Sequence, residues 1–276
     1  MIETAMQEVS ILSQDGTLLH LEGSPGGTPV LVLHGLGYAS WAALPLRRHL
    51  AGLSPDLGIW SLDNRGTGGS DRGSRRSSVE LLAADAALAA ERLGGGVHVV
   101  GYSMGGYIAQ VLAARRPDLV ASVVLMSTSG GGAHAVPLPE STRRAWLEAA
   151  SGPPDEYARR TMPLSFRPGW PEDHPKEYQA VLEARLRRPT PAEVWREQYE
   201  ECEKYLLAGC DIERLTAPAL VLHGGADRVL PVENGRALAN ALPAAVYQEY
   251  PAAGHLLHIE EPARVAADLS HFFSRP

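Results

Sequence analysis

The chain has 276 residues, which is long enough for one large domain or two small ones and for a substantial buried core. It is 45% hydrophobic and 21% charged, as expected of a globular protein, and its net charge of −7 without a basic cluster argues against nucleic acid as a partner. Residues 1–10 lack the apolar segment of a secretory signal, and no apolar run approaches the roughly 20 residues that span a bilayer. We therefore expect a cytoplasmic protein that does not associate with a membrane.

The first elements in the chain are short strands. Gln7–Leu12 and Thr17–Glu22 flank Asp15-Gly16, a pattern that predicts a β-hairpin. After a glycine-rich loop, the run Val-Leu-Val-Leu at 30–33 predicts a fully buried strand. It is followed by His34-Gly35-Leu36-Gly37, whose glycines allow the backbone to approach a bound substrate closely.

Buried strands and helices then alternate along the chain. We expect further strands at 59–62, from Val97, at 120–126, at 219–224 and at 246–250. We expect helices from about Ser40, at 79–93, at 107–116, at 232–241 and from Glu260. This alternation predicts an α/β fold in which helices cover both faces of a predominantly parallel sheet.

The alternation is interrupted between residues 134 and 211, where the pattern is helical and broken by prolines. We therefore predict a core formed by residues 1–133 and 212–276, with a helical cap of residues 134–211 inserted in it. The cap holds eight of the 17 aromatic residues. Its rings either line an apolar substrate pocket or form the cap's own core, and we expect two or three of them to face the pocket.

One stretch carries the strongest chemical signal. A β-branched run from Val97 predicts a buried strand, Gly101-Tyr102-Ser103-Met104-Gly105 follows it, and a helical pattern continues to Arg116. A strand that turns directly into a helix around one serine holds that serine on a strained bend with its hydroxyl exposed. Side chains at positions 101 and 105 would collide with the neighbouring strand and helix. The Met104 N–H would then lie at a helix N-terminus, where negative charge is favoured.

This arrangement is a nucleophile elbow, and the chain around it resembles the alpha/beta-hydrolase family. The resemblance extends from about Thr17 to the last helix but does not include the cap. It implies an acid and a histidine that follow the serine in the order Ser, Asp, His. It also implies that the Leu36 N–H is the second donor of an oxyanion hole whose first donor is the Met104 N–H.

Asp227 and His255 are the residues that fit this order. Asp227 lies just past one predicted strand and His255 just past the last, so both lie at the carboxyl ends of strands, as Ser103 does. Since the carboxyl ends of parallel strands meet at one edge of a sheet, the three side chains can converge there. Asp227 could instead cap the next helix, and Asp211, the nearest rival acid, precedes its strand and would lie at the opposite edge.

Other candidate sites are weaker. His255 and His258 have helical spacing, but no third ligand is spaced to match them, so we predict no metal site and no cofactor. His34 and His223 end strands and fit packing or hydrogen-bonding roles. Cys202 and Cys210 fit no metal-binding or redox pattern and are expected to be free thiols.

The loop from Asp63 to Ser70 resembles the Asp-x-Arg-Gly-x-Gly-x-Ser loop of the family. Arg65 is expected to form an ion pair there or to bind carbonyl groups. Its glycines fit neither of the common phosphate-binding patterns. We therefore interpret this loop as structural.

The sequence thus predicts a serine hydrolase in which Ser103 attacks an acyl carbon, His255 transfers the proton and Asp227 orients His255. The expected substrate is a small or medium carboxylic ester or lactone with an apolar portion, and oligomeric state is not predicted. The same triad serves carbon–carbon bond hydrolases, thioesterases and non-hydrolytic biosynthetic enzymes among family relatives. A non-catalytic protein that binds a small ligand is the remaining alternative.

Overall fold

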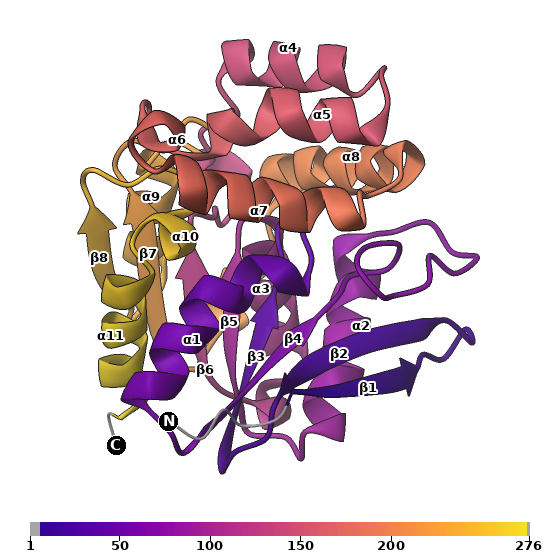
Figure 1. The fold of residues 1–276 in the computed structure, drawn as a ribbon. Coiled ribbons are helices and arrows are strands. Elements are labelled where there is room, and N and C mark those ends of the chain that lie inside the picture. The colour runs from indigo at the N-terminus through magenta and orange to yellow at the C-terminus, as the bar shows by residue number, and fades with distance from the viewer. Residues whose placement is uncertain (1–5, 275–276) are drawn as a thin grey trace.

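The sheet is built from eight strands within residues 6–274, which are the residues that the computed structural model describes. The strands are β1 (Gln7–Leu12), β2 (Leu18–Ser24), β3 (Thr28–Leu33), β4 (Leu57–Leu62), β5 (Val97–Tyr102), β6 (Val120–Met126), β7 (Ala219–Gly224) and β8 (Val246–Tyr250). Their order in the sheet is β1-β2-β4-β3-β5-β6-β7-β8 (Figure 1). β1 pairs with β2 and β2 with β4 in antiparallel fashion, and all the other pairs are parallel. The predominantly parallel sheet is as predicted.

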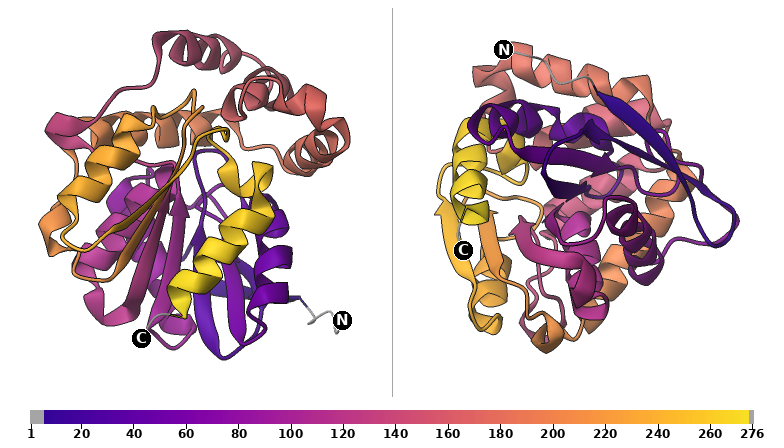
Figure 2. Two further views of the ribbon diagram at one scale, coloured as in Figure 1. Left: turned by 90° about the vertical axis from the view of Figure 1, so that its left-hand side faces the viewer. Right: turned by 90° about the horizontal axis from the view of Figure 1, so that it is seen from below.

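Helices cover both faces of this sheet. One face carries α1 (Leu44–Leu53) and α11 (Pro262–Phe273), and the other carries α2 (Val79–Arg92), α3 (Met104–Arg115) and α9 (Glu233–Ala241) (Figure 2). The alternation of side chains along β3 explains this: Val30 and Val32 pack in the cluster of α1 and α11, whereas Leu31 and Leu33 pack in the cluster of α2 and α3. A strand with both faces covered needs apolar residues at every position.

Three helix starts differ from the sequence expectation by two residues or more. α3 begins at Met104, immediately after Ser103, rather than at Tyr107. A 3₁₀ turn, Ser40–Ala43, precedes α1. The last helix is preceded by a separate short helix, α10 (Leu257–Glu260), and α11 begins at Pro262, where a missing N–H has no cost.

The segment between β6 and β7 is helical and is called here the helical insertion (residues 134–211). It contains α4 (Glu140–Ala149), α5 (Pro154–Thr161), α6 (Trp170–Asp173), α7 (Pro175–Arg187) and α8 (Ala192–Ala208). These helices lie over the carboxyl ends of the parallel strands (Figure 1). Prolines at the starts of α5 and α7 fit a position that needs no backbone donor, so the prolines mark helix starts within the insertion.

Arg65 ties the hairpin to the helical layer. Its side chain is buried and donates to both carboxylate oxygens of Asp85 in α2, at 2.5 and 2.8 Å, and to Asp15 in the hairpin turn at 2.6 Å. The expected ion pair is therefore confirmed. Cys202 and Cys210 are free, also as expected. None of the helices in the described part of the chain combines the length and the apolar character needed to cross a membrane.

Candidate active site

Ser103 lies on a strained bend between β5 and α3. Its backbone angles are φ +54° and ψ −124°, and Ser127 is the other non-glycine residue with positive φ in residues 6–274. A Cβ added to Gly101 would lie 2.2 Å from the Gly105 carbonyl oxygen, and one added to Gly105 would lie 2.1 Å from that of Leu33. Both glycines are required by these close approaches, as the sequence predicts. Strain of this kind costs of order 1–3 kcal/mol and is often found at functional sites.

The bend is fixed by hydrogen bonds to β6 and the loop after it. The Ser103 N–H donates to the Met126 carbonyl at 2.9 Å, and the Thr128 hydroxyl donates to the Ser103 carbonyl at 2.8 Å. The backbone of the serine is therefore held on both sides while its side chain remains at the wall of a cavity.

His255 and Asp227 are brought together from the two strand ends that the sequence indicated. His255 Nδ1 lies 2.8 Å from Asp227 Oδ2, and both side chains are buried. The second carboxylate oxygen accepts the N–H groups of Val229 at 2.7 Å and Leu230 at 2.9 Å. Because a carboxylate can only accept, Nδ1 carries the proton of a neutral His255 and Nε2 is left as an acceptor.

Asp227 remains ionised in this setting. Burial by itself raises the pKa of its carboxyl, but the neighbouring His255 and His223 lower it to about 2. His223 Nε2 lies 2.9 Å from the Leu230 carbonyl and 3.3 Å from Asp227 Oδ2. The hydrogen bond from His223 to the backbone confirms its expected structural role, whereas its contact with Asp227 was not predicted.

Ser103 and His255 both line one pocket, which encloses about 340 Å³ of space, part of it open to solvent. It is lined by Gly35, Leu36, Tyr38, Tyr102, Ser103, Trp146, Tyr157, Thr161, Ser165, Arg185, His255 and Leu256. Within the described chain no hydrogen bond joins the Ser103 hydroxyl to another group, and such contacts commonly tighten only when substrate binds. Two rings of the helical insertion, Trp146 and Tyr157, are among the lining residues.

Two backbone N–H groups next to the serine are available to bind an anion. In residues 6–274 neither the Leu36 N–H nor the Met104 N–H has a hydrogen-bond partner. A Cβ on Gly35 would lie 3.1 Å from the Ser103 Cβ, so the loop carrying Leu36 directly adjoins the serine. The helical insertion holds this loop: Gln198 Oε1 accepts the Gly37 N–H at 2.9 Å and the Thr190 hydroxyl donates to the Gly37 carbonyl at 3.1 Å.

Glu260 and Arg228 fasten the insertion to the loops of the candidate triad. Glu260 Oε1 accepts the Gly254 N–H at 3.0 Å and the Arg167 N–H at 3.1 Å, so one oxygen joins the His255 loop to the insertion. Arg228, next to Asp227, donates to the carbonyls of Pro163 at 2.7 Å and Phe166 at 3.0 Å. The sequence does not reveal the role of either residue, because the partners that link them to the insertion are backbone groups more than 60 residues away along the chain.

The rival residues lie elsewhere. Asp211 is exposed and pairs with Arg214 at 3.5 Å. His258 is buried against the Tyr102 ring, with ring centroids 4.3 Å apart, and burial lowers its pKa to about 3.

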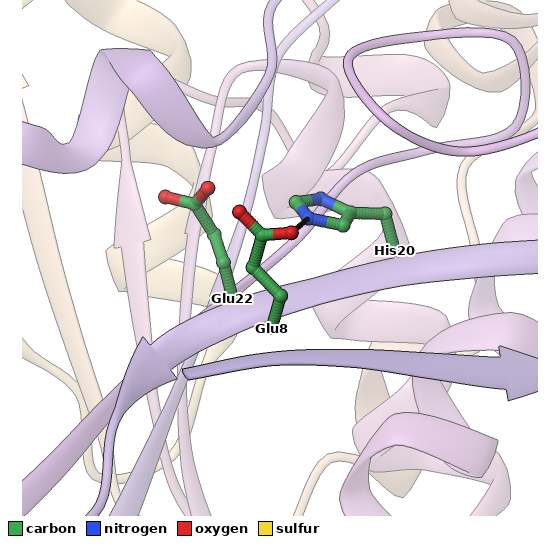
Figure 3. A group of neighbouring side chains, drawn as sticks. All are labelled: Glu8, His20 and Glu22. Atoms are coloured by element: carbon green, nitrogen blue, oxygen red, sulfur yellow. Dashed lines mark ion pairs between the residues drawn. The ribbon is translucent and has the colours of Figure 1, made fainter. Parts of the chain in front are cut away.

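Glu8, His20 and Glu22 on β1 and β2 form the remaining cluster of potential metal ligands in the described chain (Figure 3). His20 Nδ1 is bonded to Asp63 at 2.9 Å and Glu22 to Arg47 at 3.0 Å. The two half-buried members of this cluster, His20 and Glu22, are thus already paired with protein groups. The cluster is therefore not evidence for a metal site.

Comparison with known proteins matches this geometry to a family. A family model described as the alpha/beta hydrolase fold matches residues 28–262. The chain belongs to the alpha/beta-hydrolase family. It is 31% identical to a pimeloyl-[acyl-carrier protein] methyl ester esterase of Chromobacterium violaceum, over 91% of this chain and 97% of that protein. It is 26% identical to a 2-hydroxymuconate semialdehyde hydrolase of a Pseudomonas species, over 94% and 91% of the two chains.

A solved structure agrees with the assignment to the alpha/beta hydrolases. The thermophilic esterase of Thermogutta terrifontis is 27% identical to this hydrolase and superimposes with a TM-score of 0.81, over 97% of this chain and 98% of that one. The resemblance seen in the sequence is thereby confirmed, and the chain is placed in a family of hydrolases.

Proposed function

We propose that this alpha/beta hydrolase is a serine hydrolase that cleaves a carboxylic ester or lactone through an acyl-enzyme intermediate. The observation that carries the proposal is the shared cavity: Ser103 and His255 both line it, and the Nδ1 atom of His255 is held by the buried carboxylate of Asp227. A hydroxyl, a base and an acceptor that fixes the tautomer of the base are the three parts that a serine nucleophile needs.

The reaction follows from the placement of these groups. His255 Nε2 takes the proton of the Ser103 hydroxyl as the oxygen attacks the acyl carbon. The charge that develops on the carbonyl oxygen is stabilised by the free N–H groups of Leu36, which lines the cavity, and of Met104, which directly follows Ser103. His255 then gives the proton to the leaving alcohol, and water attacks the acyl-enzyme by the same route in reverse.

The helical insertion acts as a cap in this proposal. It supplies Trp146, Tyr157 and Arg185 to the cavity wall and, through Gln198 and Thr190, holds the loop that carries the Leu36 N–H. The apolar rings favour a substrate with an apolar portion, and closure over the serine excludes bulk water.

The relatives bear on the choice of bond. One is named as a methyl ester esterase and the solved relative as an esterase, which supports ester cleavage. Another is named as a 2-hydroxymuconate semialdehyde hydrolase, which keeps carbon–carbon bond cleavage as the second candidate.

The test is hydrolysis of p-nitrophenyl esters of rising acyl length and of simple lactones. The panel includes esters and lactones that also carry a carboxylic acid. Ser103→Ala should abolish turnover while circular dichroism shows an intact fold. Ser127→Ala is the matched control, because Ser127 is the other serine with positive φ and lies buried at the end of the neighbouring strand β6. Turnover that survives in Ser103→Ala would contradict the serine mechanism. If the folded wild-type protein hydrolyses none of these substrates, the result would favour carbon–carbon bond cleavage or a non-catalytic binding role.

A further inference from the structure

Arg185 is a charged residue in an apolar position. It lies on α7, where it and Leu182 are the buried residues, and only 6% of its surface is exposed. Its guanidinium lies over the Tyr38 ring, 4.7 Å from the centroid, and 5.7 Å from the centroid of Tyr157. Its one side-chain hydrogen bond is a long one, from Nη1 to the Tyr38 hydroxyl at 3.4 Å. The surroundings of this cation are therefore aromatic.

The other two buried arginines of the described chain have carboxylate partners. Arg47 lies 3.0 Å from Glu22, and Arg65 binds Asp85 and Asp15. By contrast, residues 6–274 place no carboxylate oxygen within 4.0 Å of the Arg185 guanidinium. A buried charge without a counter-ion is strongly unfavourable. The absence of a carboxylate beside Arg185 within these residues therefore indicates that its charge is balanced by a bound ligand.

The guanidinium also lies close to the candidate oxyanion hole. Arg185 lines the cavity with Ser103 and His255, and a Cβ on Gly37 would lie 3.8 Å from Arg185 Nη2. Gly37 adjoins Leu36, whose N–H faces the developing oxyanion in the proposed reaction. A negatively charged group bound by Arg185 would therefore belong to the same molecule that Ser103 attacks.

We propose that Arg185 binds a carboxylate of the substrate, so that the substrate class is a monoester or lactone that also carries a free carboxylic acid. This inference rests on the proposed hydrolase function and names its substrate more closely. The planar guanidinium matches a carboxylate in a two-point contact, and burial among rings makes that contact stronger than in water. Of the residues that line the cavity, Arg185 alone is a lysine or arginine, so one carboxylate balances its charge whereas a phosphate dianion would not.

Matched pairs of esters test the proposal. The substrates are the monomethyl esters of succinic, glutaric and adipic acid, each paired with the methyl ester of butanoic, pentanoic or hexanoic acid, in which a methyl group replaces the carboxylate. Acid release is followed at constant pH. The wild-type chain should prefer the acid-bearing member at the chain length that spans Ser103 and Arg185.

Arg185→Gln should lower the ratio of kcat/KM for the acid-bearing ester to that for its neutral partner, by on the order of 100-fold, as expected for a lost charged hydrogen bond. Arg187→Gln, an exposed arginine on the same helix, is the control and should leave the ratio unchanged. Equal ratios in the wild type and Arg185→Gln at all three chain lengths would overturn the proposal.

Binding separates this proposal from the proposed chemistry. Calorimetry of the three monomethyl esters with Ser103→Ala should show binding that is lost in Ser103→Ala/Arg185→Gln. If that binding is seen but the wild type turns over no ester, the carboxylate site stands and the hydrolase proposal fails. If the wild type hydrolyses esters but Ser103→Ala binds all six esters equally, the hydrolase proposal stands and the carboxylate site fails.

Stability gives a further readout that also guards against misfolding. Arg185→Met removes the unpaired charge and keeps an apolar side chain of similar length, so the midpoint of thermal unfolding should rise. A purely structural role, with the cation clamped between Tyr38 and Tyr157, requires the midpoint to fall.

Discussion

At the scale of single residues, Asp227 decides which nitrogen of His255 can act as a base. Its carboxylate accepts from His255 Nδ1 and is fixed by two backbone N–H groups, so Nε2 is left as the acceptor of a residue that lines the cavity. The lowered pKa of Asp227, about 2, keeps it ionised throughout the range in which a histidine can be neutral. The hydrogen bond is therefore present at any pH where the reaction can proceed.

Asp227→Asn should lower kcat by about 10³- to 10⁴-fold with little change in fold, because the amide favours the wrong tautomer of His255. The measurement is steady-state kinetics on the best ester, with circular dichroism as the check on structure. A kcat within tenfold of the wild type would show that another group orients His255.

Gly105 shows how tightly the elbow is packed. A Cβ there would lie 2.1 Å from the Leu33 carbonyl oxygen, so Gly105→Ala should lower the free energy of unfolding by about 2–3 kcal/mol or more and reduce activity. Gly52→Ala is the matched control, because Gly52 lies in helix α1 with nothing within 4 Å and should gain about 0.5–1 kcal/mol. Urea denaturation measures both. Equal effects would contradict the packing argument.

How far the site could be predicted depends on the kind of residue. Ser103, Asp227 and His255 were foreseeable because each follows a strand, and strand ends of a parallel sheet share an edge. Arg185 was not, since a charged residue among the charges of α7 has the pattern of a solvent-exposed face. Its burial comes from Tyr38, which is 147 residues away, and from Tyr157. Such long-range contacts leave no local signal.

At the scale of elements, the helical insertion and the His255 loop are joined by Glu260. Gly254 has room for no side chain there, since an added Cβ would lie 2.3 Å from the Arg167 nitrogen. The Leu256 N–H also donates to the Ser165 carbonyl at 3.0 Å. The turn around residues 162–167 is thus fixed to the core, and motion of the insertion would have to occur in its other helices.

Glu260 gives this junction a pH dependence. Burial raises the pKa of its carboxyl to about 7, against the opposing effect of the Arg167 and Gly254 N–H groups. The native state therefore keeps a proton that the unfolded chain has lost between pH 4.5 and 7, and the free energy of unfolding should fall as pH rises through this range.

The free energy of unfolding should fall by about 1–3 kcal/mol less in Glu260→Gln than in the wild type between pH 4.5 and 7. Urea denaturation across this pH range measures the difference. Glu261→Gln, which changes the next residue and its surface pair with Arg264, is the control and should keep the wild-type slope. The same slope in Glu260→Gln and the wild type would contradict the assignment.

The strands were the most predictable elements. β6 and β7 have the bounds expected from the sequence, because buried strands with both faces covered are continuous apolar runs ended by polar residues or glycine. The start of α3 was placed three residues late, since Gly105-Gly106 does not favour a helix and is tolerated only for the close packing around Ser103. At these two glycines the packing that the site requires overrides the low helix propensity of the residues.

In the molecule as a whole, the sheet and the helical insertion have different roles in the proposed reaction. The core brings Ser103, Asp227, His255 and two free N–H groups to one edge, where backbone hydrogen bonds and close packing fix them. The insertion covers that edge (Figure 1) and supplies two rings, Trp146 and Tyr157, and the one guanidinium of the cavity wall. Reaction type would thus belong to the core and substrate choice to the insertion.

The most direct test of the serine mechanism is to find which residue a fluorophosphonate labels. The reagent phosphonylates an activated serine, and peptide mass spectrometry locates the adduct. We predict one adduct, on Ser103, that is absent from folded Ser103→Ala and unchanged in Ser127→Ala. A folded wild-type chain that carries its adduct on a different serine, or none on Ser103, would contradict the claim that Ser103 is the nucleophile.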